Sequence, residues 1–199
     1  MKTAAGLHAI GEHLSAGGIV ILSGDALREG DLDFAMAASR VTAEAINFMA
    51  RHGRGLICLG LTQERAAELG ITLQNRGTTA DSGRPFGVSI EAKHGVDTGI
   101  SAHDRAHTIA VAMASDARAG DLVSPGHVFP LIAHPGGVEA RLSTLEAGIA
   151  LCRNFGLGDG VVLCAILRAD GTMARVEDMA EFAGAHATPI VDITALVGG

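Results

Sequence analysis

The feature that most constrains the fold is the alternation of short apolar runs with helix-like segments along the whole chain. Apolar runs of strand length lie at residues 19–22, 56–61, 86–92, 128–133, 161–167 and 190–192. Segments with helical spacing or N-cap residues alternate with them, at 4–16, 42–53, 62–70, 101–115, from 143 onward and near 176–186. Because no linker or internal repeat interrupts the series, we expect a single α/β domain over residues 1–199, with a mixed sheet and helices on its faces.

Charge and cysteine content exclude several classes of protein. The formal net charge of −7 argues against nucleic acid or an anionic membrane as a partner. The apolar runs are too short to span a bilayer, and the polar N-terminal segment does not have the pattern of a signal peptide. Three widely spaced cysteines without a CxxC pair indicate a reduced, cytoplasmic setting.

Acidic side chains gather in the polar stretch between residues 23 and 33. Asp25, Glu29, Asp31 and Asp33 all lie in it. Such a cluster is typical of a solvated loop. The same side chains could also serve base catalysis or hold a displaced metal ion. The residues alone leave both interpretations open.

A second polar group stands at the start of the segment that begins at residue 143. Ser143 and Glu146 have the spacing of a capping box, and Arg141 lies just before them. Backbone N–H groups at a helix start, with the hydroxyls of Ser143 and Thr144, suit a phosphate or carboxylate, so a small anionic substrate is one expectation. The alternative is that Ser143 is only an N-cap and Arg141 only a surface group.

The histidines and cysteines give no metal motif. His103 and His107 lie one helical turn apart and could share a face, but no third ligand is in view, so we expect no zinc site. His127, between a glycine and an apolar run, has by itself the setting of a structural histidine. Cys58 lies in an apolar strand, which favours core packing over a nucleophile.

Four segments carry a resemblance that extends along nearly the whole chain. Their sequences are RHGRGLICL at 51–59, TGISAHDR at 98–105, PGHVFPL at 125–131 and DGTMAR at 170–175. In order and spacing the chain is similar to the 3,4-dihydroxy-2-butanone 4-phosphate synthase family of riboflavin biosynthesis, from roughly residue 5 to residue 195. The resemblance implies that family's fold.

The resemblance also implies which residues form a site. The family's reaction removes C4 of ribulose 5-phosphate as formate, through a metal-held enediolate that needs acid–base groups around it. By position, the implied catalytic residues are His127, Glu29, Asp31 and Cys58. The implied substrate-binding residues are Thr98, Asp104, Arg105, Arg141, Ser143, Thr144, Glu146 and, as an added charge, Arg54.

This sequence departs from the family at the positions that hold the metal ion. The family's acidic loop Asp-Arg-Glu-Asn-Glu-Gly-Asp is DALREGD at 25–31 here, so its metal-binding Glu is Leu27. The family's Arg-Gly-Gly-His-Thr-Glu is RLSTLE at 141–146, so its metal-binding His is Thr144. The family's Glu after a buried Cys is Ala165. We therefore expect no metal and no other cofactor, and magnesium only if ligands from the acidic loop are relocated.

Three functions fit these observations. The first, which the retained polar positions favour, is an enzyme with altered, metal-independent chemistry of lyase, isomerase or ring-opening type on a small anionic carbonyl compound. The second is a non-catalytic partner or regulator of a riboflavin-pathway enzyme. The third is the family's own reaction, ribulose 5-phosphate to dihydroxybutanone phosphate plus formate, with relocated metal ligands. The resemblance and the Gly-rich loops favour a homodimer in each case.

Overall fold

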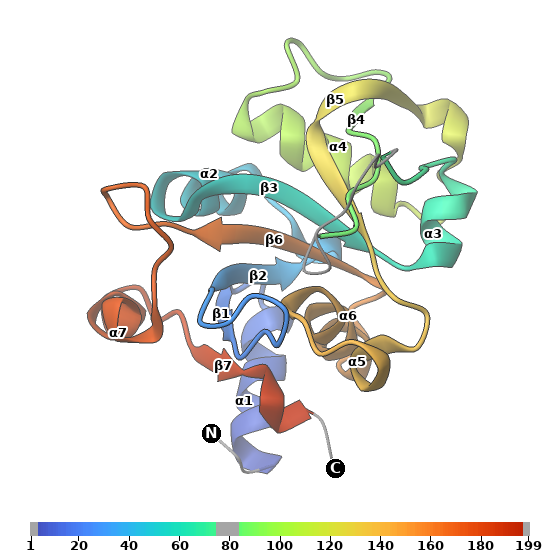
Figure 1. Cartoon of the computed structure of the whole chain (residues 1–199). Helices are drawn as coiled ribbons and strands as arrows, with labels where there is room; N and C mark the ends of the chain where they lie inside the picture. Colours follow the sequence, from blue (N-terminus) through green and yellow to red (C-terminus); the bar gives the residue numbers. More distant parts are fainter. Residues whose placement is uncertain (1–3, 75–83, 197–199) are drawn as a thin grey trace.

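The computed structural model describes residues 4–74 and 84–196, and these residues fold around one seven-stranded sheet (Figure 1). The strands are β1 (Val20–Ser23), β2 (Asp33–Ala37), β3 (Arg54–Leu61), β4 (Ile90–Ala92), β5 (Leu122–Ile132), β6 (Gly160–Ile166) and β7 (Ile190–Asp192). Their order across the sheet is β4-β5-β3-β6-β2-β1-β7. The β1–β7 and β3–β5 pairs run parallel and the other pairs antiparallel. The α/β class and the mixed sheet predicted from the sequence are confirmed.

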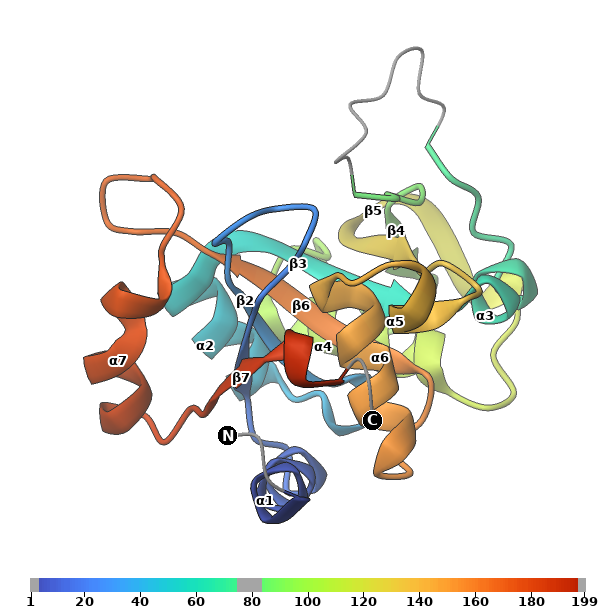
Figure 2. The ribbon, with the colours of Figure 1, turned by 60° about the horizontal axis from the view of Figure 1, so that its bottom comes forward.

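Helices cover both faces of this sheet. They are α1 (Ala4–Ser15), α2 (Ala43–Gly53), α3 (Gln63–Glu68), α4 (Ala102–Met113), α5 (Gly137–Ala140), α6 (Thr144–Asn154) and α7 (Val176–Ala185). Figure 2 shows α6 in front of the sheet and α4 behind it. One core contains side chains of α2, α4 and α7, and the other contains side chains of α1 and α6, so the sheet separates two apolar layers.

The interior strand β2 shows how the two layers are divided. Phe34 and Met36 point into the core with α2 and α4, whereas Ala35 points into the core with α1 and α6. Because side chains alternate along a strand, Asp33 shares the face of Ala35. The charged first residue of β2 therefore lies on the α6 side of the sheet, and it is fully buried there.

Sequence reasoning missed β2. Its sequence DFAMA opens with an acidic residue and contains two alanines, a composition that is depleted in strands. The segment is a strand because β1 and β6 flank it on both sides, and all five of its residues are buried. Tertiary pairing here overrides local preference.

Two other predicted strands have different bounds. The run at 86–92 forms a strand only at Ile90–Ala92, while Phe86 and Gly87 take part in isolated bridges. Strand β5 begins at Leu122, before the apolar run at 128–133, because its first half pairs with the short β4.

Three predicted helix starts are confirmed by their capping bonds. The hydroxyls of Thr42, Thr62 and Ser101 each accept a hydrogen bond from the backbone N–H three residues further on, at 3.2, 3.1 and 3.0 Å. Such an N-cap contributes about 1 kcal/mol to helix stability. These caps fix where α2, α3 and α4 begin, and so where the loops before them end.

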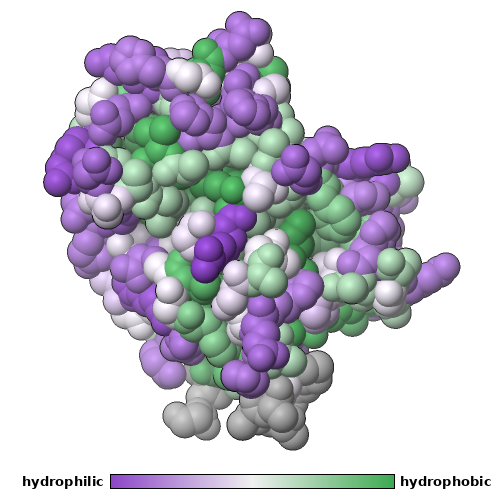
Figure 3. Space-filling model, turned by 180° about the vertical axis from the view of Figure 1, so that it is seen from behind, coloured by the Kyte–Doolittle hydropathy of each residue, from purple (hydrophilic) through white to green (hydrophobic). Residues whose placement is uncertain are grey.

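The surface carries both polar and apolar residues. Seen from behind, hydrophilic residues prevail at the margin, and apolar patches lie toward the middle of that face (Figure 3). Among the described residues, Leu56, Leu73, Ile100 and Val123 are large apolar side chains that remain exposed. No helix in residues 4–74 and 84–196 is long and apolar enough to cross a membrane. The homodimer stays a prediction.

Gly55 in β3 packs so tightly against β6 that a side chain there should destabilise the fold. A Cβ atom on Gly55 would lie 2.4 Å from the carbonyl oxygen of Ala165. We expect Gly55→Ala to lower the free energy of unfolding by about 1–3 kcal/mol, measured by urea denaturation. Gly120→Ala is the matched control, since nothing lies within 4 Å of a Cβ atom at Gly120. Equal stability of the two variants would contradict this close packing.

Candidate functional site

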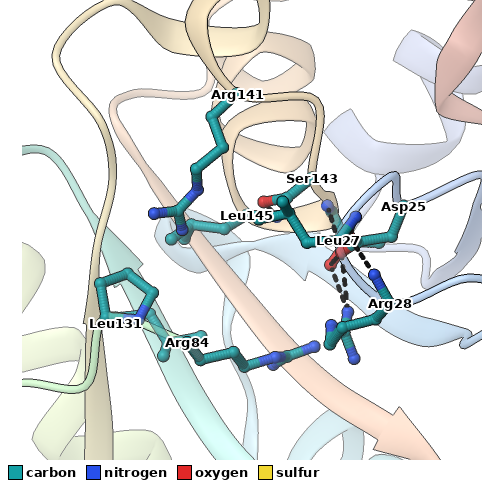
Figure 4. A pocket seen from close by; sticks show the side chains of 10 residues that line it. Asp25, Leu27, Arg28, Arg84, Leu131, Arg141, Ser143 and Leu145 are labelled. Atoms are coloured by element: carbon teal, nitrogen blue, oxygen red, sulfur yellow. Dashed lines mark hydrogen bonds and ion pairs between the residues drawn. The ribbon is translucent and has the colours of Figure 1, made fainter. Parts of the chain in front are cut away.

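A pocket opens where the loop before β2, the segment before β4, the end of β5 and the start of α6 meet (Figure 4). Its lining residues are Asp25, Leu27, Arg28, Arg84, Pro85, Leu131, Arg141, Ser143, Thr144 and Leu145. Three of these side chains are guanidinium groups, so the pocket carries an unusual number of cations for a protein of net negative charge. Such a lining suits a small anion.

Arg28 is the most connected side chain of the pocket. Its Nη2 atom donates to Asp25 Oδ2 at 3.0 Å and to Asp33 Oδ2 at 2.5 Å. The same atom lies 3.0 Å from Thr144 Oγ1. Its Nη1 atom lies 3.6 Å from Asp31 at the rim. One guanidinium therefore joins the acidic loop to the start of α6.

Asp33 is the buried anion at the floor of this network. Both of its carboxylate oxygens accept from Arg84 Nη2, at 2.6 and 2.5 Å, and Oδ2 also accepts from Thr144 Oγ1 at 2.6 Å. Burial by itself raises the pKa of Asp33, but the charges of Arg84 and Arg28 and the hydrogen bonds from Arg84 and Thr144 outweigh it. The pKa of Asp33 is thus held below its ordinary value, and the carboxyl is ionised.

Asp25 holds the acidic loop in a turn and also caps the start of α6. Its Oδ1 atom accepts from the backbone N–H groups of Leu27 and Arg28, at 2.9 and 3.1 Å. Its Oδ2 atom accepts from the backbone N–H of Thr144 at 3.2 Å. The acidic stretch is therefore not a uniformly solvated loop, because Asp25 and Asp33 are buried structural anions.

Arg141 reaches into the pocket from the chain before α6, on the side where Arg84 lies (Figure 4). Its Nε atom is 3.2 Å from Glu146 Oε1, yet within the described residues this buried nitrogen has no hydrogen bond of acceptable geometry. The two charges still attract each other, because the attraction at this separation depends little on their alignment. Arg141 is thus held by its charge partner and keeps donors for a ligand.

The predicted capping box at Ser143 and Glu146 is only half present. The Ser143 hydroxyl accepts from the backbone N–H of Leu145 at 3.3 Å, as an N-cap does. The Glu146 carboxylate does not accept the hydrogen bond from the Ser143 backbone N–H that a capping box requires. It accepts instead from the Ser143 hydroxyl and from the His134 backbone N–H, the latter at 2.8 Å. This buried carboxylate therefore anchors the chain between β5 and α6.

The other residues implied as catalytic do not line this pocket in the structure. His127 Nδ1 is 2.9 Å from Glu91 Oε2 on the β4–β5 ribbon, four positions before the pocket residue Leu131. Asp31 pairs with Arg175 Nη1 at 2.9 Å, and the same nitrogen donates to the backbone carbonyl of Glu29 at 3.0 Å. The Glu29 side chain is exposed at the rim.

Cys58 lies beneath the pocket, in the core with α6. Burial raises the pKa of its thiol to about 12, and the nearby Arg84 only partly offsets this. The thiol is therefore protonated at neutral pH, which favours the packing interpretation over a nucleophile.

The remaining implied substrate-binding residues also lie outside the pocket. Asp104 accepts from the backbone N–H of Gly99 at 3.1 Å and so shapes the loop that carries the exposed Thr98. Burial lowers the pKa of Arg105, whose Nε atom has no hydrogen-bond partner in the described part of the chain. Arg54, in the left-handed region at φ 65°, donates to the carbonyl of Leu167 at 2.9 Å.

Sequence reasoning missed the roles of Arg28 and Arg84. Arg28 was visible as a departure in the acidic loop, and its position among four carboxylates was the available signal. Arg84 stands in a Gly- and Thr-rich stretch, where nothing local shows that its side chain reaches β2. Both act through contacts distant in sequence, up to 116 positions for Arg28 and Thr144.

Comparison with known proteins assigns a family to this arrangement. Residues 8–198 match the family described as 3,4-dihydroxy-2-butanone 4-phosphate synthase. The chain is 50% identical to the riboflavin biosynthesis protein RibBA of Aquifex aeolicus, over 94% of this chain and 46% of that protein. It is 45% identical to a 3,4-dihydroxy-2-butanone 4-phosphate synthase of Pseudomonas aeruginosa, over 94% of this chain and 51% of that protein. The chain thus spans about half the length of these curated relatives.

A solved structure gives the same result over nearly the whole length of both chains. A 3,4-dihydroxy-2-butanone 4-phosphate synthase in complex with two magnesium ions superposes with a TM-score of 0.89 and 34% sequence identity. The match covers 96% of this chain and 94% of that chain. The fold expected from the resemblance is therefore confirmed.

The buried ion pairs of Asp33 should dominate the stability of the site. We expect Asp33→Asn to lower the free energy of unfolding by about 3–5 kcal/mol, because Arg28 and Arg84 then lose their buried counter-charge. Asp159→Asn is the control: Asp159 pairs with Arg153 at 2.5 Å, with both side chains 53% exposed. That change should cost less than about 1 kcal/mol in the same denaturation experiment.

The acid dependence of stability offers a second measurement on the same variants. Because the folded-state pKa of Asp33 is lowered, its stabilisation is present above the ordinary carboxyl pKa of about 4 and is lost as pH falls through the folded-state value. Asp33→Asn should therefore show a weaker loss of stability in acid than the unaltered protein. An unchanged acid profile would contradict a buried, ionised Asp33.

Proposed function

The chain belongs to the 3,4-dihydroxy-2-butanone 4-phosphate synthase family, and on that premise we propose that it acts on ribulose 5-phosphate in riboflavin biosynthesis. The relatives' names support the family's own reaction better than the altered chemistry that the retained polar positions favour. We therefore propose the conversion of ribulose 5-phosphate to dihydroxybutanone phosphate and formate as the activity of this chain.

The observation that carries the proposal is the arginine-lined pocket. Arg28 and Arg84 neutralise the two buried aspartates, and among the described residues Glu146 is the acidic partner of Arg141. A phosphate group can receive charge-assisted hydrogen bonds from guanidinium groups such as those of Arg141 and Arg84. The substrate's phosphate then lies against the start of α6, and its carbon chain extends along the acidic loop.

The pocket does not fit the divalent cation found with the solved relative. Leu27 has no donor atom, and Thr144 already donates to Asp33. The carboxylates of Asp25 and Asp33 are paired with guanidinium groups. Among the described residues, no group of three or more His, Cys, Asp or Glu side chains could hold a metal ion.

A second candidate function follows from one specific observation. Ala165 faces Asp33 across the β2–β6 pair, at the position where the family has a Glu, so the pocket lacks that acid–base group. An enzyme with a different lyase or isomerase step on the same substrate class is the alternative. The non-catalytic partner is the remaining alternative.

Formate release tests these functions directly. The protein is purified from a host that lacks its own synthase and is supplied with riboflavin, and is then incubated with ribulose 5-phosphate. Formate and dihydroxybutanone phosphate in equal amounts are the expected products. Consumption of the sugar phosphate without formate would replace the proposal by the second candidate. Binding without consumption would establish the non-catalytic alternative.

Two substitutions locate the substrate. Arg141→Ala should weaken binding of ribulose 5-phosphate by about 1.5–3 kcal/mol in a calorimetric titration, the loss expected for a charge-assisted bond. Arg141→Lys keeps a charge beside the buried Glu146, so it separates lost binding from lost stability.

Arg153→Ala is the control for these variants, since Arg153 lies outside the pocket on the exposed end of α6. If Arg141→Ala and Arg153→Ala bind the substrate equally well, the phosphate does not lie at Arg141.

A further inference from the structure

One guanidinium nitrogen occupies the centre of the polar cluster. Arg28 Nη2 lies within 3.0 Å of Asp25, Asp33 and Thr144 together. A single donor atom thus contacts two buried carboxylates and a hydroxyl, each from a different segment of the chain. This is the kind of position from which a cation holds oxygen ligands together.

The charges of the cluster already balance without an added ion. Asp25 and Asp33 bring two negative charges, and Arg28 and Arg84 bring two positive charges to the same buried place. The side chain of Asp33 is 0% exposed and that of Asp25 is 2% exposed, so solvent screens these charges weakly. An additional divalent cation would leave an excess of two positive charges in a buried environment, which is costly.

We propose that Arg28 is a built-in cation that replaces the divalent metal ion in this site, so that the protein binds its anionic substrate without a metal. The identity of that substrate rests on the function proposed above. For a metal ion to reach the carboxylates, Arg28 has to leave and three contacts have to break. An apolar residue at position 27 is consistent with this role of Arg28, because a site without a metal ion needs no ligand from Leu27.

The replacement links substrate binding to the position of α6. Arg28 and Asp25 both contact Thr144, the first residue of that helix, and Ser143 and Arg141 precede it directly. The guanidinium of Arg28 therefore joins the acidic loop to the start of this helix.

Binding of Mn²⁺, followed by electron paramagnetic resonance, tests the proposal independently of activity. The unaltered protein should show no saturable binding. A variant that combines Leu27→Glu, Arg28→Asn and Thr144→His provides oxygen and nitrogen ligands and removes the guanidinium, and it should bind Mn²⁺ saturably. Arg28→Lys keeps a charge in place and should remain unable to bind the ion.

The outcomes are distinct. Saturable Mn²⁺ binding by the unaltered protein, lost in Asp33→Asn, would overturn the proposal. If the triple variant does not fold, the proposal is tested on the unaltered protein. Its affinity for ribulose 5-phosphate is then measured by calorimetric titration in EDTA and in magnesium chloride. Equal affinity in the two solutions supports the built-in cation, and binding that requires magnesium refutes it. Absence of ribulose 5-phosphate binding in both solutions refutes the proposed function, while the Mn²⁺ experiment still decides the role of Arg28.

Discussion

The ionised carboxylate of Asp33 is the interaction on which the site and its surroundings depend. It is fully buried at the first position of β2, so its charge has to be compensated inside the protein. Arg28 compensates it from the acidic loop, Arg84 from the segment before β4, and Thr144 from the start of α6. Three segments that are distant in sequence are thereby held at one point, and the pocket is the space that they enclose.

The sheet makes this arrangement possible. Strand β2 lies between β6 and β1, with Asp33 on the face that α6 covers. Opposite Asp33 on strand β6 stands Ala165, whose small side chain carries no charge. A larger acidic residue at that position would add a third negative charge to the cluster. The neutral side chain at 165 and the guanidinium of Arg28 thus both suit the single buried anion Asp33.

Much of the fold was predictable because local signals and tertiary packing agree over most elements. The N-caps at Thr42, Thr62 and Ser101 marked helix starts that the structure confirms. Strand β2 was not predictable, since its alanines and its leading Asp33 form a strand only between two neighbours. The local amino-acid composition does not indicate such strand pairing.

The site was predictable in part, for a similar reason. Arg141, Ser143 and Thr144 were expected together because they adjoin a recognisable helix start, and the structure places them on one pocket wall. The partners of Asp33 come from loops whose conformation no pattern specifies, so Arg28 and Arg84 were missed as site residues. His127, Thr98 and Arg54 resemble family positions, yet in the single chain they lie outside this pocket. Sequence position alone does not show which surfaces face one another.

The most direct measurement is a crystal structure of the protein grown with ribulose 5-phosphate and magnesium chloride. We expect the phosphate group against Arg141, with Arg28 still between the carboxylates of Asp25 and Asp33 and no metal ion there. A magnesium ion held by those carboxylates, with the Arg28 side chain displaced from them, would contradict this expectation.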